Sequence, residues 1–198
     1  MNVKPKFVGI AGGTGAGKST VCMALHEKYP DTIGVIQLDD YFKPDPEKPQ
    51  MGGVVNADHP DALYWDRLIH ALGELAAGRS VMVNTKNLRL NPDYAKTKQR
   101  ISVQCDPKPI MLIEGFLILH DEHVRKFLNT TIWLDVPHDV RWERRVHFKN
   151  DEYEQKVLKP MHEQYAEPSK RYAEHIIDVT KLTKEKTQKQ VEDIIFSL

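Results

Sequence analysis

Short apolar runs recur along the chain and alternate with longer amphipathic stretches. Five of the runs are rich in Val, Ile or Leu, and most lack clean alternation: residues 7–11, 34–38, 110–114, 131–136 and 175–179. Such runs are typical of parallel strands that are covered on both faces. The stretches with helical character are residues 18–28, 62–77, 138–148, 152–165 and 184–196. Strands that alternate with helices predict an α/β fold of three layers, built on a five-stranded, mostly parallel sheet.

Two segments fit this pattern less well. Residues 44–54 are rich in Pro and Gly, which predicts a loop. Residues 84–106 are polar and basic with weak periodicity, and the pattern assigns no element to them.

The composition mainly excludes some classes of protein and of site. At about 100–200 residues per domain, the 198 residues predict a single domain, residues 1–198. The 28 basic and 28 acidic residues cancel, which argues against a nucleic-acid binder that depends on a broad positive field. Cys22 and Cys105 are each isolated, so no disulfide framework can be written. No secretory signal is seen and no apolar run reaches the roughly 18–20 residues of a membrane span, so we expect a cytoplasmic protein without a membrane partner.

The strongest chemical signal is a glycine-rich segment between the first predicted strand and the first predicted helix. It matches G-x-x-x-x-G-K-[ST] in full and comprises Gly12, Gly13, Thr14, Gly15, Ala16, Gly17, Lys18 and Ser19, with Thr20 in the same helical turn. Its glycines let successive N–H groups point at phosphate oxygens, and the helix N-terminus adds positive potential. Lys18 supplies a cation for the β- and γ-phosphates, and the Ser19 hydroxyl is a ligand for Mg²⁺. We therefore expect the chain to bind a nucleoside triphosphate.

The loop alone does not separate a kinase from a GTPase or an NTPase motor. A GTPase is expected to carry an N-K-x-D guanine-reading motif, and the sequence contains none. A motor usually needs a larger chain or partner domains. The choice therefore depends on the other polar residues.

Two predicted strands end in acidic residues, at the sheet edge where open α/β sheets bind their ligands. Asp39 and Asp40 follow the second strand, and Glu114 ends the third. Phosphoryl transfer to a hydroxyl needs a base or orienting group for the attacking O–H, a role that suits Asp39, and an acid for Mg²⁺, a role that suits Glu114. The structural alternatives are that Asp39 caps a helix and that Glu114 only makes a structural hydrogen bond. We assign Asp40 to such a capping or supporting role.

Several longer segments stand out along the chain: GGTGAGKST, QLDDYFKP, NADHPDALYWDRL, PIMLIEGFLIL, RWERRV and KPMHEQYAEPSKRYAEHIID. Together they resemble the uridine kinase family, of which nicotinamide riboside kinases are close relatives. DHPDA, IEG and KPMHEQYAEPSK are much more specific than the phosphate loop, which many families share. The resemblance implies a kinase with the P-loop NTPase fold that uses ATP and Mg²⁺.

The resemblance also implies roles for individual residues. Asp39 matches the catalytic aspartate that activates a ribose 5′-hydroxyl. Asp58 matches an aspartate that binds the ribose 2′- and 3′-hydroxyls, and one carboxylate can accept from both members of a cis-diol. Glu114 matches the acid associated with Mg²⁺. Without the family, Asp58 would be read as an ordinary loop or helix-start residue.

Three arginines follow the fourth predicted strand. Spacings of three and four residues place Arg141, Arg144 and Arg145 near one face of a helix. Such a cluster can close over a triphosphate and neutralise the transferring group, and in the family this helix leads into a mobile lid, which is short here. We assign Arg141 and Arg145 to catalysis, Arg144 to the nucleotide, and Arg145 also to the acceptor. The alternative is a solvated basic face paired with acids such as Glu143.

The sequence leaves the acceptor open. Uridine kinases carry a Y-D-F-x-x-H-S-like segment that helps to read the pyrimidine, and the corresponding residues 83–94 lack this motif and its histidine. The first expectation is a kinase for the 5′-hydroxyl of a uridine- or cytidine-like ribonucleoside. The alternatives are nicotinamide riboside or another small hydroxyl acceptor, and a nucleotide-binding regulator without catalysis. Homo-oligomerisation cannot be read from the sequence.

Overall fold

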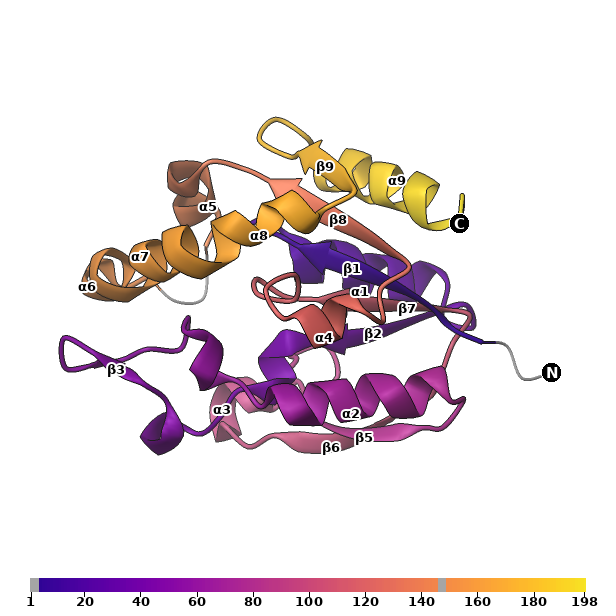
Figure 1. The fold of residues 1–198 in the computed structure, drawn as a ribbon, viewed down its shortest axis with the longest axis horizontal. Coiled ribbons are helices and arrows are strands. Elements are labelled where there is room, and N and C mark those ends of the chain that lie inside the picture. The colour runs from indigo at the N-terminus through magenta and orange to yellow at the C-terminus, as the bar shows by residue number, and fades with distance from the viewer. Residues whose placement is uncertain (1–3, 146–148) are drawn as a thin grey trace.

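A five-stranded sheet forms the centre of the computed structural model, which describes residues 4–145 and 149–198. Its strand order is β2-β7-β1-β8-β9 (Figure 1), with bounds β1 (Lys6–Ala11), β2 (Ile33–Gln37), β7 (Ile110–Glu114), β8 (Thr130–Asp135) and β9 (His175–Asp178). All neighbouring pairs are parallel, so the five carboxyl ends meet at one edge. The predicted three-layer α/β fold is confirmed, and each predicted strand lies within one residue of its expected bounds.

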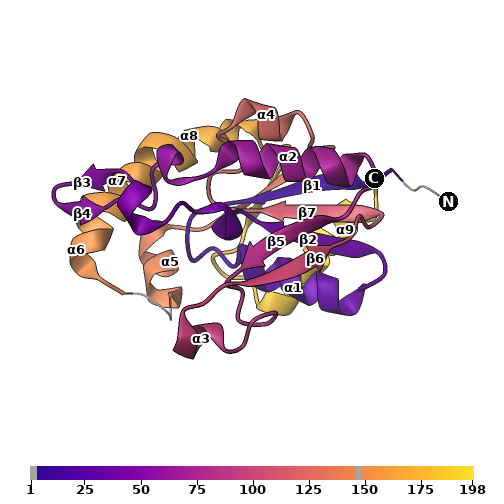
Figure 2. The same cartoon turned by 90° about the horizontal axis from the view of Figure 1, so that it is seen from below.

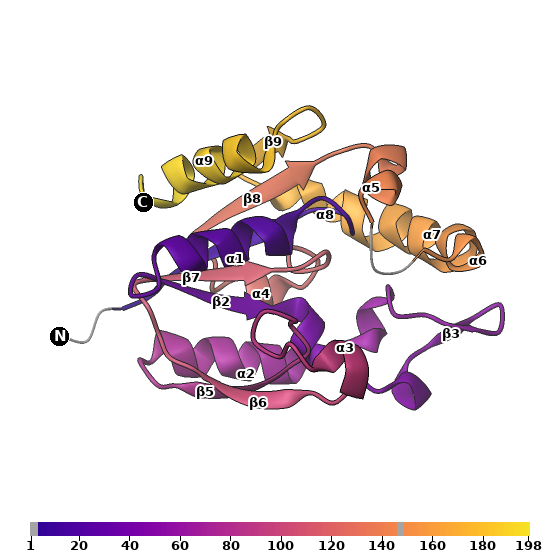
Figure 3. The ribbon, with the colours of Figure 1, turned by 180° about the vertical axis from the view of Figure 1, so that it is seen from behind.

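Helices cover both faces of the sheet, which is why its strands are apolar almost throughout. The elements α1 (Lys18–Lys28) and α9 (Lys184–Ile195) pack on one face, and α2 (Trp65–Ala76) and α4 (Glu122–Arg125) on the other (Figure 2; seen from behind in Figure 3). No helix in the described part of the chain is long and apolar enough to cross a membrane.

Two helices differ from their predicted bounds. The predicted helix 62–77 begins only at Trp65, because Leu63 has an extended backbone and pairs with Phe42 in an isolated bridge. A separate 3₁₀ turn, Pro60–Ala62, precedes it. The predicted helix 138–148 corresponds to α5 (His138–Arg144), and residues 146–148 lie outside the described residues.

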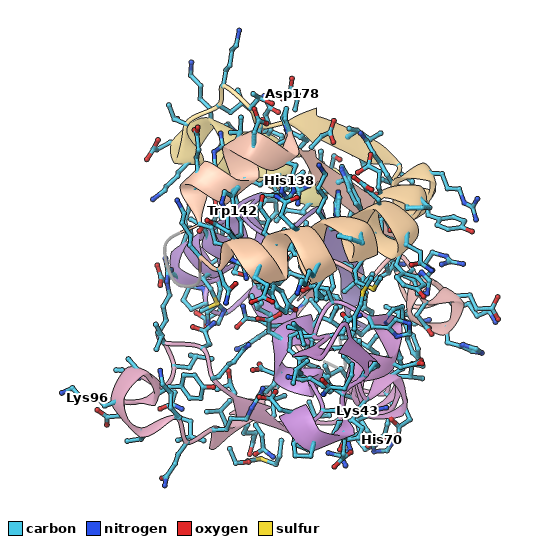
Figure 4. All side chains as sticks on the ribbon, turned by 90° about the vertical axis from the view of Figure 1, so that its left-hand side faces the viewer. Lys43, His70, Lys96, His138, Trp142 and Asp178 are labelled. Atoms are coloured by element: carbon cyan, nitrogen blue, oxygen red, sulfur yellow. The ribbon has the colours of Figure 1, made fainter. Side chains whose placement is uncertain are left out.

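The predicted helix 152–165 extends over residues 151–172, and we call this stretch the long helix (Figure 1). It contains α6 (Asp151–Tyr153), α7 (Lys159–Met161) and α8 (Glu167–Ser169), separated by π turns at Glu154–Leu158 and His162–Ala166 and ended by the 3₁₀ turn Lys170–Tyr172. Pro160 and Pro168 follow the two π turns, and a proline cannot donate the regular helical hydrogen bond. His138 lies between α5 and the long helix (Figure 4), with its Nε2 2.6 Å from Glu154 Oε1.

Within residues 4–145 and 149–198, two hairpins lie outside the main sheet. The larger one pairs β5 (Val81–Thr85) with β6 (Ile101–Cys105) beside α2, and α3 (Tyr94–Thr97) lies in the connection. It occupies most of the stretch 84–106, to which the sequence pattern assigns no element. Because one face of this hairpin is exposed and carries Asn84, Ser102 and Gln104 beside Met82, its strands lack the long apolar runs of the sheet.

The smaller hairpin pairs β3 (Gln50–Met51) with β4 (Val54–Val55), inside the predicted loop 44–54 and after the 3₁₀ turn Asp45–Glu47. Met51 and Val54 pack against the buried side chains Tyr153, Val157, Leu158 and Met161 of the long helix. Its strands are two residues each, too short for a sequence pattern to show.

The β5–β6 hairpin is attached to the end of β2 by one arginine and one buried carboxylate. Nη1 of Arg100 donates to the carbonyl oxygens of Asp40 at 3.2 Å and Asn84 at 2.9 Å, and Nη2 donates to that of Asp39 at 3.2 Å. The Asp40 carboxylate accepts from the backbone N–H of Lys86 at 3.2 Å. Burial raises the pKa of Asp40 from 3.8 to about 6, although hydrogen bonds from the Thr85 side chain and the Lys86 N–H and the charge of Arg100 favour the ionised form. Asp40 therefore supports the hairpin rather than capping a helix.

We predict that Asp40→Asn changes the pH dependence of stability. Protonated Asp40 is favoured in the folded state, so its contribution is complete below about pH 4 and is lost as the pH rises through 6. The asparagine variant does not titrate at this position. Relative to the unsubstituted protein it should gain up to about 3 kcal/mol of unfolding free energy between pH 4 and pH 7. Urea unfolding across this range measures the difference, and a difference that stays constant with pH would contradict the prediction.

Candidate active site

The glycine-rich loop runs from the end of β1 to the start of α1 and lies between β8 and α5. At Gly12 φ is +141°, and a Cβ there would lie 2.6 Å from the carbonyl oxygen of Leu134. At Gly15 φ is +90°, and a Cβ would lie 2.6 Å from the carbonyl oxygen of Arg141. A side chain at either position would displace a neighbouring backbone, so the close packing of this loop requires glycine.

Lys18 begins α1, and its side chain is buried beneath the loop. Its Nζ donates to the carbonyl oxygen of Gly13 at 3.1 Å. Burial lowers the pKa of Lys18, while the carboxylates of Glu114 and Asp39 oppose this shift. The ammonium group therefore lies close to both of the acids that the sequence singles out.

Glu114 ends β7, and its side chain is buried against the loop. Its Oε1 accepts hydrogen bonds from Ser19 Oγ and from Gln37 Nε2, both at 2.7 Å. Burial raises the pKa of Glu114, and the Lys18 cation opposes this shift. A hydroxyl and a carboxylate, together with substrate phosphates, form the kind of ligand set that Mg²⁺ prefers, so Ser19 and Glu114 fit the predicted metal site. Among the residues described, no group of three or more His, Cys, Asp or Glu could hold a metal ion.

Asp39 follows β2, in the 3₁₀ turn Leu38–Tyr41, and its side chain is 51% exposed. Its Oδ2 lies 3.1 Å from Nζ of Lys86, which follows β5. The carbonyl oxygen of Asp39 accepts from Arg100, as described above, so the hairpin contacts both its backbone and its side chain. Asp39 does not cap a helix in this structure, because Gln37 occupies the N-cap of the turn.

These groups line one cleft of about 940 Å³ at the carboxyl edge of the sheet. Its wall contains the loop residues Thr14, Gly15, Ala16, Gly17, Lys18, Ser19 and Thr20, and beyond them Asp39, Lys86, Glu114, Arg144 and Arg145. A somewhat larger cavity, of about 1010 Å³, lies between α2 and the β5–β6 hairpin and includes Lys43 and His70 (Figure 4). That cavity lacks the loop, Asp39 and Glu114, so we take the first cleft as the candidate active site.

Asp58 lies in the loop before α2, where the long helix contacts it. Tyr153 Oη donates to Asp58 Oδ2 at 2.6 Å and accepts from the backbone N–H of Ala57 at 3.2 Å. Burial raises the pKa of Asp58, which the Tyr153 hydrogen bond and the charge of Arg145 oppose. Asp58 is not among the residues that line the cleft, and the charges of Arg145, Asp39 and Lys18, which do line it, act on the Asp58 carboxylate.

The three arginines at the end of α5 make different contacts, although their spacing predicts one face, and Arg145 follows the helix as its C-cap with an extended backbone. Arg141 is buried, with Nε donating to the carbonyl oxygen of Val136 at 3.2 Å and Nη1 lying 3.5 Å from that of Thr14. It packs against the phosphate loop and is not part of the cleft wall. Arg144 and Arg145 do line the cleft. Arg144 Nη2 donates to two backbone carbonyl oxygens after β9, those of Val179 and Thr180, at 2.9 and 2.8 Å.

The sequence pattern does not mark three residues that contact the predicted site. Lys86 and Arg100 lie in the unassigned stretch 84–106, and Tyr153 lies in a predicted helix among many polar residues. One weak signal for Lys86 was available: residues 81–85 include two valines and a threonine, residue types that are enriched in strands, and this short segment ends immediately before it. For Tyr153 and Arg100 the partners are far away in sequence, and no local pattern marks them.

Known proteins give an independent comparison. The model of the Phosphoribulokinase / Uridine kinase family matches residues 7–186. A uridine kinase of Streptococcus pyogenes serotype M5 is 35% identical over 192 residues, covering 89% of this chain and 88% of that protein. A uridine kinase of Brevibacillus brevis is 32% identical over 185 residues, covering 87% and 84%.

A solved structure from Bacillus stearothermophilus, described as a "Possible Uridine Kinase", superposes with a TM-score of 0.60 at 19% identity. The superposition covers 88% of this chain and 89% of that one, and it supports the P-loop kinase fold. Together with the family match and the two relatives above 30% identity, it shows that this chain is a kinase of the phosphoribulokinase/uridine kinase family.

Proposed function

We propose that residues 1–198 act as one kinase domain that transfers the γ-phosphate of ATP to the 5′-hydroxyl of a ribonucleoside such as uridine or cytidine. The observation that carries the proposal is the meeting of Lys18, Asp39 and Glu114 in one cleft, with Asp58 beside it. A cation, a base and a metal-binding acid are the parts that phosphoryl transfer to an alcohol requires. The names of the curated relatives support the choice of nucleoside.

The donor side is formed by the loop and α5. The N–H groups of residues 14–20 and the Lys18 ammonium bind the phosphates, and Arg144 and Arg145 line the same cleft. Ser19 and Glu114 would hold Mg²⁺, which neutralises charge on the β- and γ-phosphate oxygens when bound. Arg141 acts through the loop that it contacts, by keeping the loop backbone in place during transfer.

The acceptor side is formed by the two aspartates. Asp39 accepts the proton of the attacking hydroxyl, and Asp58 accepts hydrogen bonds from the ribose 2′- and 3′-hydroxyls. Tyr153 occupies one position on Asp58 Oδ2 and fixes the carboxylate orientation, which leaves other acceptor positions for the diol. Arg145 faces both sides, because it lines the cleft and its charge reaches Asp58.

Nicotinamide riboside or another ribosyl alcohol is the second candidate acceptor. The segment 83–94 favours it, because this segment lacks the motif with which uridine kinases read the pyrimidine. A panel of uridine, cytidine, nicotinamide riboside and simple sugars, with products identified by mass, would separate these acceptors. ATP binding with no acceptor-dependent ADP formation across the panel would instead favour a regulator without catalysis.

We predict that Asp39→Asn retains ATP binding but loses turnover by about 10²-fold or more, because an amide cannot accept the hydroxyl proton. Turnover is measured as acceptor-dependent ADP release, and ATP binding by calorimetry. Turnover near that of the unsubstituted enzyme would exclude Asp39 as the base.

We also predict discrimination against a missing 2′-hydroxyl. The 2′-deoxy analogue of the best acceptor should support little or no ADP release, because it leaves the half-buried Asp58 carboxylate without one donor. Asp58→Ala should remove the preference along with most of the activity. Asp61→Ala is the matched control, since its side chain lies three residues away and is 78% exposed, and it should keep the preference. Equal rates on both nucleosides in the unsubstituted enzyme would remove Asp58 from this role.

A further inference from the structure

Beside Lys18, the lysines Lys86 and Lys184 also line the candidate active site, and the proposed function leaves both without a role. Lys86 lines the same cleft as Lys18, and its Nζ is 3.1 Å from Oδ2 of Asp39. It comes from the segment 83–94, where the motif that reads the pyrimidine in uridine kinases is absent. The hairpin thus places a cation next to the proposed base.

The position of Lys86 is determined by several contacts of the surrounding backbone. Its own N–H donates to the Asp40 carboxylate at 3.2 Å. The next residue, Asn87, donates through Nδ2 to Oε1 of Gln37, whose Nε2 donates to Glu114 at 2.7 Å. The loop after β5 is therefore bonded to the segment that carries Asp39 and, through Gln37, to the acid that fits Mg²⁺.

Stability does not account for this ion pair. The Lys86 and Asp39 side chains are 31% and 51% exposed, and pairs this exposed contribute roughly 0–1 kcal/mol. Such a pair exchanges partners readily, and the flexible lysine stem with three N–H donors can contact two anions at once. A γ-phosphate bound beside Lys18 would be the second anion within the same cleft.

We propose that Lys86 is a further catalytic residue, which donates to a γ-phosphate oxygen while it remains next to Asp39. This proposal rests on the proposed function of the cleft. In the step, the bond from the γ-phosphorus to the β,γ-bridging oxygen breaks, and a bond to the acceptor oxygen forms. The hydroxyl proton passes to Asp39, and Lys86 stays protonated throughout. Its charge stabilises the transferring group, whose negative charge is spread over its outer oxygens.

The first test is equilibrium binding, which needs no acceptor. Binding of Mg²⁺–ADP and of the Mg²⁺ complex of the β,γ-imido analogue of ATP is measured for the unsubstituted protein, Lys86→Met and Lys86→Arg. Loss of a charge-assisted hydrogen bond to the γ-phosphate should weaken analogue binding about tenfold in Lys86→Met and change ADP binding by less than about twofold. Lys86→Arg should recover part of the loss.

Lys48→Met is the matched control. Lys48 Nζ lies 5.1 Å from the Phe42 ring centre, as Lys86 Nζ does at 5.2 Å, but Lys48 pairs with Asp45 at 2.7 Å and does not line the cleft. This variant should bind both nucleotides as the unsubstituted protein does. An equal loss in Lys48→Met would attribute the effect to the general loss of positive charge near Phe42 and overturn the proposal.

The same measurement in an Asp39→Asn background separates direct contact from an indirect effect. If Lys86 touches the γ-phosphate, Lys86→Met still weakens analogue binding about tenfold when residue 39 is neutral. If Lys86 only offsets the repulsion between Asp39 and the phosphate, the effect disappears in this background, and the proposal is overturned.

Kinetics with the best acceptor complete the test. Lys86→Met should lower kcat by about 10²-fold and change the KM of the acceptor less than about threefold, because the contact strengthens in the transition state. A change confined to the acceptor KM would show that Lys86 reads the acceptor and would overturn the proposal. If the unsubstituted enzyme phosphorylates no acceptor in the panel, the proposed function fails, while the binding data still decide whether Lys86 contacts the γ-phosphate.

Discussion

Two opposite charges, those of Lys18 and Glu114, are buried together at the carboxyl edge of the sheet, and the site depends on them. Burying a charge costs several kcal/mol, which is comparable with the net free energy of unfolding of a small domain. Each of the two charges therefore needs partners. Lys18 donates to the loop, and Glu114 accepts from Ser19 and Gln37. The register holds these groups together, because Glu114 lies opposite Ile10 of β1 on one side and Gln37 of β2 on the other.

The acceptor side depends on the long helix in a similar way. One end of this helix contacts Asp58 through Tyr153, and further along it Tyr165 Oη lies 3.0 Å from His59 Nε2. His138 joins the same helix to α5, which carries the arginines. The donor-side arginines and the acceptor loop are therefore linked through one helix, so a shift of that helix would change both halves of the site.

The β5–β6 hairpin contacts the segment after β2 that carries Asp39 and Asp40. Through Arg100 it holds the backbone of Asp39 and Asp40, and through Lys86 it contacts the Asp39 carboxylate. Members of one family can share the phosphate loop and differ in substrate. A hairpin that contacts the acceptor side of the cleft can change the choice of acceptor while the loop binds phosphate in the same way.

The sequence by itself determined the sheet, the phosphate loop and the acids at the strand ends. Strands buried on both faces need long apolar runs, and the loop is a contiguous motif, so both are visible locally: residues 110–114 and 18–28 were predicted with the bounds they have in the structure. Only the tertiary structure decided that Arg141 packs against the loop, that Tyr153 bonds to Asp58 and that Lys86 reaches Asp39. These contacts join residues that are 127, 95 and 47 positions apart, and whether such side chains meet depends on how the helices and hairpins pack against the sheet. No local pattern records that packing, because a periodicity shows only which face of a segment is apolar and not which distant segment it meets.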